Sequence, residues 1–215
     1  LNALLDAGRY FLKKQERSLG VSESELIKIA VKSLGLDDLA PFDPAEKIIE
    51  YKLRGAAGDK LVDMDLIAFA DETASESPAP GGGSISAYVG TLGISLATMV
   101  ANLSAHKRGW DDRWEEFSEW AEKGQAIKNK LLLLVDEDTA AFNKIMNAFG
   151  LPKDSDTEKA ARTEAIQAAT KYAIEIPFQV METVYDSFEV IDAMVEVGNP
   201  NSITDAGVGA LCART

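Results

Sequence analysis

The chain has few residues that form disulfides or bind metals. Its 215 residues include one cysteine, Cys212, and one histidine, His106. A single cysteine excludes an internal disulfide, which is typical of proteins in a reducing cytoplasm. Zinc sites in proteins rely mainly on cysteine and histidine ligands, so a protein-built zinc site is disfavoured. We therefore expect a cytoplasmic protein that holds no metal.

Positive charge is also scarce. The chain has 22 lysines and arginines against 35 aspartates and glutamates, and its formal net charge is −13. Binding to nucleic acids or anionic membranes relies on clustered basic residues, so neither partner is expected. At 46% hydrophobic and 27% charged residues, the composition is that of a folded soluble protein. The length fits one large domain, or one medium domain with an appendage.

The longest stretch without a charged residue runs from Ser77 to Ala105. It is long enough to raise the question of a membrane span. It includes a bend rich in proline and glycine, several serines and Asn102, and its helical part is poor in leucine, isoleucine and phenylalanine. The sequence therefore predicts a buried bundle helix and no membrane span.

Helical periodicity dominates the chain, and no convincing set of alternating strands is present. We predict an all-α fold, a bundle of long, kinked helices preceded by a short, mainly helical tail. A capping box at Ser22–Glu25 and a stop at Gly35 delimit an early helix. A glycine-rich linker near residues 55–60 divides the chain into a tail, 1–58, and a helical domain, 59–215. Further helices are expected near 1–17, 62–72, 84–105, 111–149 (one or two), 157–197 (kinked or interrupted at Pro177) and from Ser202 onward.

The expected helix over 84–105 has two different faces. One carries the large apolar residues Tyr88, Leu92, Leu96, Met99 and Leu103, and the other carries the small residues Ser86, Gly90, Gly93, Ala97 and Ala101. Small residues allow another helix to approach closely. We therefore expect a central helix with neighbours on both sides.

The bend Pro78-Ala79-Pro80-Gly81-Gly82-Gly83-Ser84 leads directly into that helix. The prolines keep the approach extended, the glycines permit unusual backbone conformations, and Ser84 can cap the first turn. A helix N-terminus favours a carboxylate, a phosphate or a polar ring edge, so Gly81, Gly82, Gly83 and Ser84 are predicted substrate-binding residues. No Gly-Lys-Ser or Gly-Lys-Thr follows these glycines, which argues against a nucleotide-binding P-loop. The alternative is a plain turn with a capped helix.

Asp138 interrupts an apolar face of the helix expected over 111–149. Steps of three and four place it in line with apolar residues, whereas Asp136 and Glu137 point elsewhere; the apolar residues are Ile127, Leu131, Leu134, Ala141 and Ile145. A carboxylate there costs free energy unless it is paired, and burial favours its protonated form. It could transfer protons, or it could be the structural partner of a buried lysine or arginine.

Three other charged residues are weaker predictions. Lys107 and Arg108 follow the end of the helix over 84–105, where they suit its dipole or could attract an anionic substrate tail. Asp205 could complete a capping box begun by Ser202 or contact substrate. The lone His106 has no evident partner for a Ser-His-Asp arrangement.

Several motifs in this order resemble the formimidoyltransferase-cyclodeaminase family. The first part, to about residue 53, resembles the tail of its transferase domain, and the part from about residue 60 resembles its cyclodeaminase domain. The motifs of the first part are Leu34-Gly35-Leu36-Asp37, Pro41-Phe42-Asp43-Pro44 and Ile48-Ile49-Glu50-Tyr51. Those of the second are Ala79-Pro80-Gly81-Gly82-Gly83-Ser84, Met99-Val100, Val135-Asp136-Glu137-Asp138, Leu151-Pro152-Lys153, Glu182-Thr183-Val184, and Gly198-Asn199 with Asp205.

The resemblance implies an all-helical bundle that forms a homodimer or higher homo-oligomer, with folate at the subunit interface. It implies an ammonia lyase of histidine degradation that converts 5-formimidoyltetrahydrofolate to 5,10-methenyltetrahydrofolate, with Asp138 as the catalytic residue. Tetrahydrofolate, polyglutamylated in some forms, is then both substrate and one-carbon carrier. On this basis we expect Gly81–Ser84 to hold a polar part of the folate and Lys107 and Arg108 to attract its glutamate tail.

Two departures from the family pattern limit these expectations. The transferase catalytic histidine has no counterpart here, so we do not expect this chain to transfer the formimidoyl group by itself. The family's bundle continues beyond Thr215 by about a pair of helices. Two alternative functions remain open: a methenyltetrahydrofolate cyclohydrolase on the same fold, and a folate-binding or assembly module without turnover.

Overall fold

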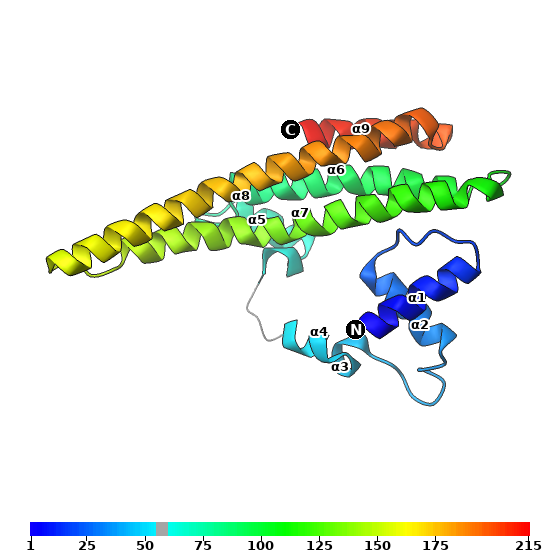
Figure 1. The fold of residues 1–215 in the computed structure, drawn as a ribbon, viewed down its shortest axis with the longest axis horizontal. Helices are drawn as coiled ribbons and strands as arrows, with labels where there is room; N and C mark the ends of the chain where they lie inside the picture. The colour runs from blue at the N-terminus through cyan, green and yellow to red at the C-terminus, as the bar shows by residue number, and fades with distance from the viewer. Residues whose placement is uncertain (55–59) are drawn as a thin grey trace.

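The computed structural model describes residues 1–54 and 60–215, and these residues form helices and no strands (Figure 1). The all-α prediction is therefore confirmed. The predicted linker over 55–60 falls, apart from Lys60, outside the described residues. The helices form a small N-terminal group and a bundle of long helices.

The N-terminal group consists of α1 (Asn2–Lys14), α2 (Glu23–Ser33), α3 (Pro44–Lys47) and α4 (Ile49–Arg54). Its small core contains Ile27, Val31 and Ile48. The Ser22 hydroxyl caps α2 by accepting the Glu25 N–H at 3.3 Å, and Gly35, at a φ of 66°, follows the helix end as predicted. The other half of the capping box is not formed, and the Glu25 carboxylate pairs with Lys28 Nζ at 3.5 Å.

The bundle contains α5 (Leu66–Thr73), α6 (Gly82–Ala105), α7 (Trp114–Phe149), α8 (Asp156–Val197) and α9 (Ile203–Arg214), with short 3-10 turns at Leu61–Asp63, Asp111–Arg113 and Pro200–Ser202. Helix α6 packs against α7, α8 and α9, and α7 packs along α8. The long α7 and α8 run side by side past the start of α6 (Figure 1). This arrangement makes α6 the central helix, as expected.

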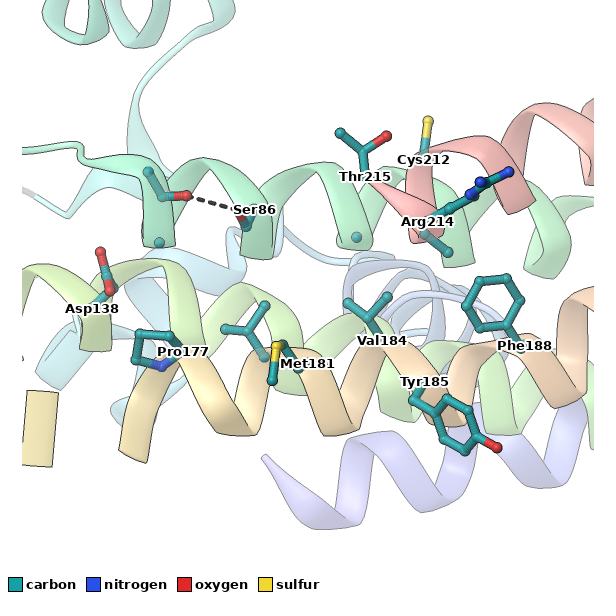
Figure 2. Close-up of a pocket in the computed structure, with 15 residues that line it drawn as sticks. Ser86, Asp138, Pro177, Met181, Val184, Tyr185, Phe188, Cys212, Arg214 and Thr215 are labelled. Atoms are coloured by element: carbon teal, nitrogen blue, oxygen red, sulfur yellow. Dashed lines mark hydrogen bonds between the residues drawn. The ribbon is translucent and has the colours of Figure 1, made fainter. Parts of the chain in front are cut away.

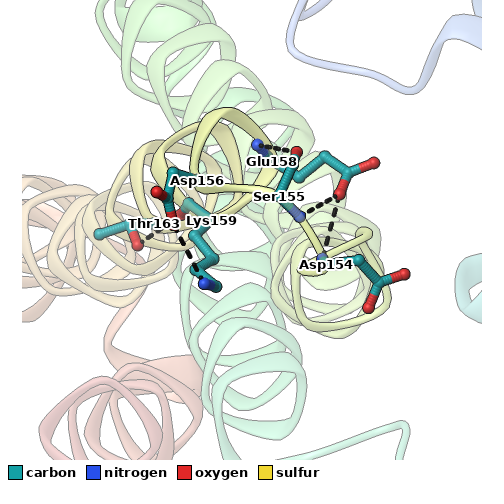
Figure 3. Close-up of polar contacts among 6 residues, drawn as sticks. All are labelled: Asp154, Ser155, Asp156, Glu158, Lys159 and Thr163. Carbon is teal, nitrogen blue, oxygen red and sulfur yellow. Dashed lines mark hydrogen bonds and ion pairs between the residues drawn. The ribbon is translucent and has the colours of Figure 1, made fainter.

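Helix α8 passes through Pro177 without a break, so of the two predicted outcomes, a kink or an interruption, the interruption is wrong. Packing on α6 and α7 holds the helix together despite the backbone bond that proline cannot make. Its start is fixed by a capping box that the sequence analysis missed (Figure 3): Ser155 Oγ accepts the Glu158 N–H at 3.2 Å, and Glu158 Oε2 accepts the Ser155 N–H at 2.8 Å. The bond from Ser155 lowers the pKa of Glu158.

The two faces of α6 have different surroundings. Helices reach it closely on the small-residue face: a Cβ added at Gly93 would lie 2.8 Å from the Gly209 carbonyl of α9, and one at Gly90 would lie 2.6 Å from Val184 Cγ2 of α8. The prediction that neighbours also cover the large apolar face is wrong, because Leu92, Met99 and Leu103 are 45%, 39% and 46% exposed. Small residues allow all three neighbouring helices to share one side of α6.

Helix α6 alone among the described helices is long and apolar enough to cross a membrane. Of its most apolar stretch, 56% is buried inside the protein. The core helix of a soluble bundle has the same property. The helix therefore gives only weak support for a membrane span.

A short segment of the N-terminal group, residues 18–20, docks on the bundle through its backbone. Side chains of α6 and α7, and the residue after α6, bind this docking segment. The Ser18 N–H donates to His106 Nε2 at 3.2 Å, and the Leu19 N–H donates to Ser118 Oγ at 2.8 Å. The Gly20 carbonyl accepts hydrogen bonds from Asn102 Nδ2 at 2.8 Å and Gln125 Nε2 at 3.3 Å. Position 20 is a glycine because the α7 backbone leaves no room for a side chain.

Gly20→Val is expected to detach the docking segment. Its Cβ would lie 2.6 Å from the backbone nitrogen of Glu122, which cannot move aside without distorting α7. We expect a loss of about 1–3 kcal/mol of stability and faster hydrogen exchange at Ser18 and Leu19. Lys14→Val, at an exposed position of α1, is the control. Unchanged exchange in Gly20→Val would contradict the docking role.

The docking segment should also loosen at acidic pH. His106 Nε2 accepts the Ser18 N–H, so the ring must be unprotonated there. Burial lowers the pKa of His106, and the charge of Arg17 lowers it further. Its stabilising contribution is complete above the ordinary value of 6.5 and is lost as the pH falls through the lowered pKa. The protection of the Ser18 amide, which is its exchange rate relative to the intrinsic rate at the same pH, should fall over that range, and His106→Gln, which keeps an acceptor without titrating, should remove the dependence.

Candidate functional site

A cavity of about 660 Å³ lies where α6 begins, between α7, α8 and the end of α9 (Figure 2). Its volume is in the range of small-molecule sites. We call it the α6–α8 cavity. It is lined by Gly82, Gly83, Ser86 and Gly90 of α6, Asp138 of α7, Pro177, Val180, Met181, Val184, Tyr185 and Phe188 of α8, and Cys212, Ala213, Arg214 and Thr215 at the chain end.

Asp138 is half-buried at one end of this cavity and is held by the first turn of α6. Its Oδ2 accepts the Ser84 N–H at 3.0 Å and lies 3.2 Å from Ser84 Oγ. The Ser84 hydroxyl is also 2.8 Å from the Val135 carbonyl, so its one proton reaches one of these two acceptors at a time. The carboxylate is thus oriented by a backbone amide and by the positive end of the helix dipole.

The absence of a side chain at Gly83 makes this contact feasible. A Cβ there would overlap Asp138 Oδ1 and would lie 2.5 Å from its Cγ, whereas Cβ atoms at Gly81 and Gly82 would meet nothing within 4 Å. The three glycines therefore have different roles. Gly83 makes room for the carboxylate, and Gly81 and Gly82 leave the helix entrance open.

Ser84 does not cap α6 in the predicted way. Gly81 is the N-cap and Ser84 is the third residue of the helix, so the Ser84 amide is one of the unsatisfied N–H groups of the first turn, and Asp138 satisfies it. Among the described residues, no acceptor is present for the amides of Gly82 and Gly83. Both residues line the cavity, and their amides could donate to a polar ligand edge.

The neighbouring carboxylates of α7 have other partners, as the periodicity predicted. Asp136 Oδ1 accepts the Leu61 N–H at 2.8 Å, and burial raises the pKa of Asp136. Glu137 accepts a hydrogen bond from the Tyr172 hydroxyl. Neither side chain lines the α6–α8 cavity, so Asp138 is the acidic residue of that site.

The apolar floor of the cavity was not predicted. It comes from α8, on which Pro177, Met181 and Tyr185 recur every four residues and Phe188 follows. Residues at this spacing form a stripe along one face of the helix. The stripe differs from one packed in the core because its side chains are partly exposed: Met181 is 62% and Tyr185 77% exposed. The repeat, with proline in the helix, was the signal that could have revealed it.

The predicted cations lie far from this cavity. Helix α6 has 24 residues and is about 36 Å long, with Asp138 at its start and Lys107 and Arg108 beyond its end. Lys107 Nζ lies 3.7 Å from the centre of the Trp110 ring. Within one chain, these two residues therefore cannot share a site with Gly81–Ser84.

Asp205 is also outside the cavity lining. It lies in the first turn of α9, eight residues before Ala213 and thus about 12 Å from it along the helix. The alternative for Asp205, a capping box with Ser202, is wrong, because the Ser202 side chain caps no α9 amide. In the part of the chain that the structure describes, no cluster of three or more potential metal ligands is present.

The fold and site define a helical-bundle protein with a carboxylate-bearing small-molecule cavity. The sequence model described as formiminotransferase-cyclodeaminase matches residues 65–215, and that of the formiminotransferase domain matches residues 1–54. The chain therefore belongs to the formiminotransferase-cyclodeaminase family, which confirms the resemblance stated above.

Individual relatives agree with this assignment. Rat formimidoyltransferase-cyclodeaminase is 36% identical over 216 residues, covering 100% of this chain and 40% of the relative. The chain thus spans about two fifths of such relatives. A methenyltetrahydrofolate cyclohydrolase of Methylorubrum extorquens is 35% identical over 157 residues, covering 73% of this chain and 74% of the relative.

A solved structure supports the fold. The formiminotetrahydrofolate cyclodeaminase of Thermotoga maritima superposes with a TM-score of 0.61 at 30% identity, covering 70% of this chain and 71% of that chain.

Proposed function

We propose that this chain carries a formimidoyltetrahydrofolate cyclodeaminase site, which converts 5-formimidoyltetrahydrofolate to 5,10-methenyltetrahydrofolate and ammonia. The observation that carries the proposal is the carboxylate of Asp138, fixed by the Ser84 amide at the mouth of an apolar cavity. Membership of the family and the cyclodeaminase among its structural neighbours support it.

The reaction needs a group that moves one proton over a short distance. Folate N10 attacks the carbon of the protonated formimidoyl group, which forms the N10–C bond and leaves a proton on N10. The Asp138 carboxylate accepts that proton and donates it to the amino nitrogen. The C–N bond then breaks, ammonia departs, and the methenyl cation remains. The carboxylate ends in its starting state, as expected of a general base that then acts as general acid.

The surrounding residues position the substrate. The free amides of Gly82 and Gly83 can donate to polar atoms of the pterin, and the α8 floor, including Met181 and Val184, can pack against the aminobenzoyl ring. Ser84 keeps the Asp138 carboxylate facing the bound carbon. These roles require no metal.

A cyclohydrolase function is the second candidate, and the relative from Methylorubrum extorquens favours it. The same carboxylate would then activate water to open the methenyl ring. The test is to supply each substrate separately, 5-formimidoyltetrahydrofolate and 5,10-methenyltetrahydrofolate, beside a folate-binding titration. Ammonia from the first with slow hydrolysis of the second supports the cyclodeaminase; the reverse supports the cyclohydrolase. Binding without turnover would support a non-catalytic module and overturn both.

We further propose that the chain forms a homodimer or higher homo-oligomer in the cytoplasm. There it acts as a lyase of histidine degradation, as part of a bifunctional protein that also transfers formimidoyl groups. The exposed apolar face of α6 supports self-association, since Leu92, Met99 and Leu103 on that face are all exposed. Light scattering of Leu92→Glu should then show a smaller particle than the parent chain. An unchanged mass would contradict the use of this face.

A further inference from the structure

We propose that Arg214 binds a carboxylate of the substrate's glutamate tail, at the end of the α6–α8 cavity opposite Asp138. This inference rests on the proposed function and names a specificity-determining residue for it. It assigns the anion-binding role to a residue that the sequence analysis did not consider.

The cavity is elongated, with its two charged side chains at opposite ends. Figure 2 shows Asp138 beside Pro177 and Arg214 near Phe188. Phe188 follows Pro177 by eleven positions on α8, which corresponds to about 16 Å along the helix. A ligand that contacts both charged groups must therefore be long and mainly apolar between its ends.

Arg214 is available to such a ligand. In the described part of the chain no carboxylate pairs with it, and among the described residues that line the cavity it is the one with a positive charge. The net charge of −13 makes most of the protein surface unfavourable for a carboxylate. The Arg214 guanidinium is therefore the charged group of this cavity that favours the negative end of a ligand.

The order of groups in a folate matches the order of residues in the cavity. The reacting N5–N10 bridge would lie at Asp138, the aminobenzoyl ring on Met181 and Val184, and the glutamate carboxylate at Arg214. Arginine offers a planar fork that can bind a carboxylate with two parallel hydrogen bonds, which lysine cannot. Arg214 should therefore distinguish ligands that carry a glutamate from those that lack it.

The test compares tetrahydrofolate with tetrahydropteroate, the same ring system without glutamate, by binding titrations on the whole chain. Arg214→Gln should weaken tetrahydrofolate binding about tenfold or more and leave tetrahydropteroate binding unchanged. Arg214→Lys should restore part of the loss, since it keeps the charge without the fork. The matched control is the double variant Lys107→Gln/Arg108→Gln, which should bind both ligands as the parent does.

Three results would overturn the inference: equal losses for both ligands in Arg214→Gln, no loss for either, or a glutamate-specific loss in the double variant. Binding is measured without turnover, so the result does not depend on cyclodeaminase activity. If the parent chain binds neither ligand, the proposed function fails with this inference. If it binds both equally well, only the role of Arg214 fails.

Discussion

Asp138→Asn should lower the rate of ammonia release from 5-formimidoyltetrahydrofolate by about 10²- to 10⁴-fold, the usual contribution of a general acid–base group. The amide oxygen of asparagine can still accept the Ser84 N–H, so the first turn of α6 stays capped. What is lost is the ability to accept the N10 proton and return it to the leaving nitrogen. Steady-state rates of ammonia formation measure this loss, and circular dichroism shows whether the variant is folded.

The control for this substitution is Asp136→Asn, two residues earlier on α7. The Asp136 carboxylate accepts the Leu61 N–H at 2.8 Å and lines no part of the α6–α8 cavity. We expect this variant to change stability and to keep the reaction rate. If Asp138→Asn retained the parent rate, or if a folded Asp136→Asn lost as much activity, the proton-transfer role of Asp138 would be wrong.

Gly83→Ala should lower the reaction rate without unfolding the protein. The added Cβ would overlap Asp138 Oδ1 and lie 2.5 Å from Cγ, and because these atoms are at the end of a side chain, the whole carboxyl group can swing away. Alanine also favours a helix over glycine by about 1 kcal/mol, which offsets part of the strain. A shift of the carboxylate by about 1 Å can cost about 10²-fold in rate. Initial rates at saturating substrate measure the effect.

Gly81→Ala is the matched control for the glycine bend. Its Cβ would meet nothing within 4 Å, and its φ of −95° suits any residue. We expect near-parental rates in this variant. Equal activity of Gly83→Ala and Gly81→Ala would show that the position of the Asp138 carboxylate does not depend on the space at residue 83.

Much of the bundle could be predicted from local patterns. The uncharged stretch with its glycine bend predicted α6 to within two residues of its start, and helical periodicity placed Asp138 on the inner side of α7. Both predictions depend on spacing along one helix, which sequence records directly. The resemblance to the family added the reaction, which no spacing could supply.

What failed depends on the packing between helices. Periodicity identified two faces of α6 but could not tell that all its neighbours would choose the small one, so Leu92 and Met99 were expected to be covered. Gly81–Ser84 were expected to hold a polar part of the folate and Lys107 and Arg108 to attract its glutamate tail, although within one chain the helix keeps its ends about 36 Å apart. The floor on α8 and Arg214 of α9 reach the cavity only through tertiary packing.

The most direct measurement is a single turnover with the protein in excess over 5-formimidoyltetrahydrofolate, in which bound folate and released ammonia are determined in the same samples. Our account predicts that the parent chain binds the folate and releases ammonia, and that Asp138→Asn binds it equally well and releases almost none. Release by Asp138→Asn at the parental rate, or binding by the parent with no ammonia at all, would contradict it.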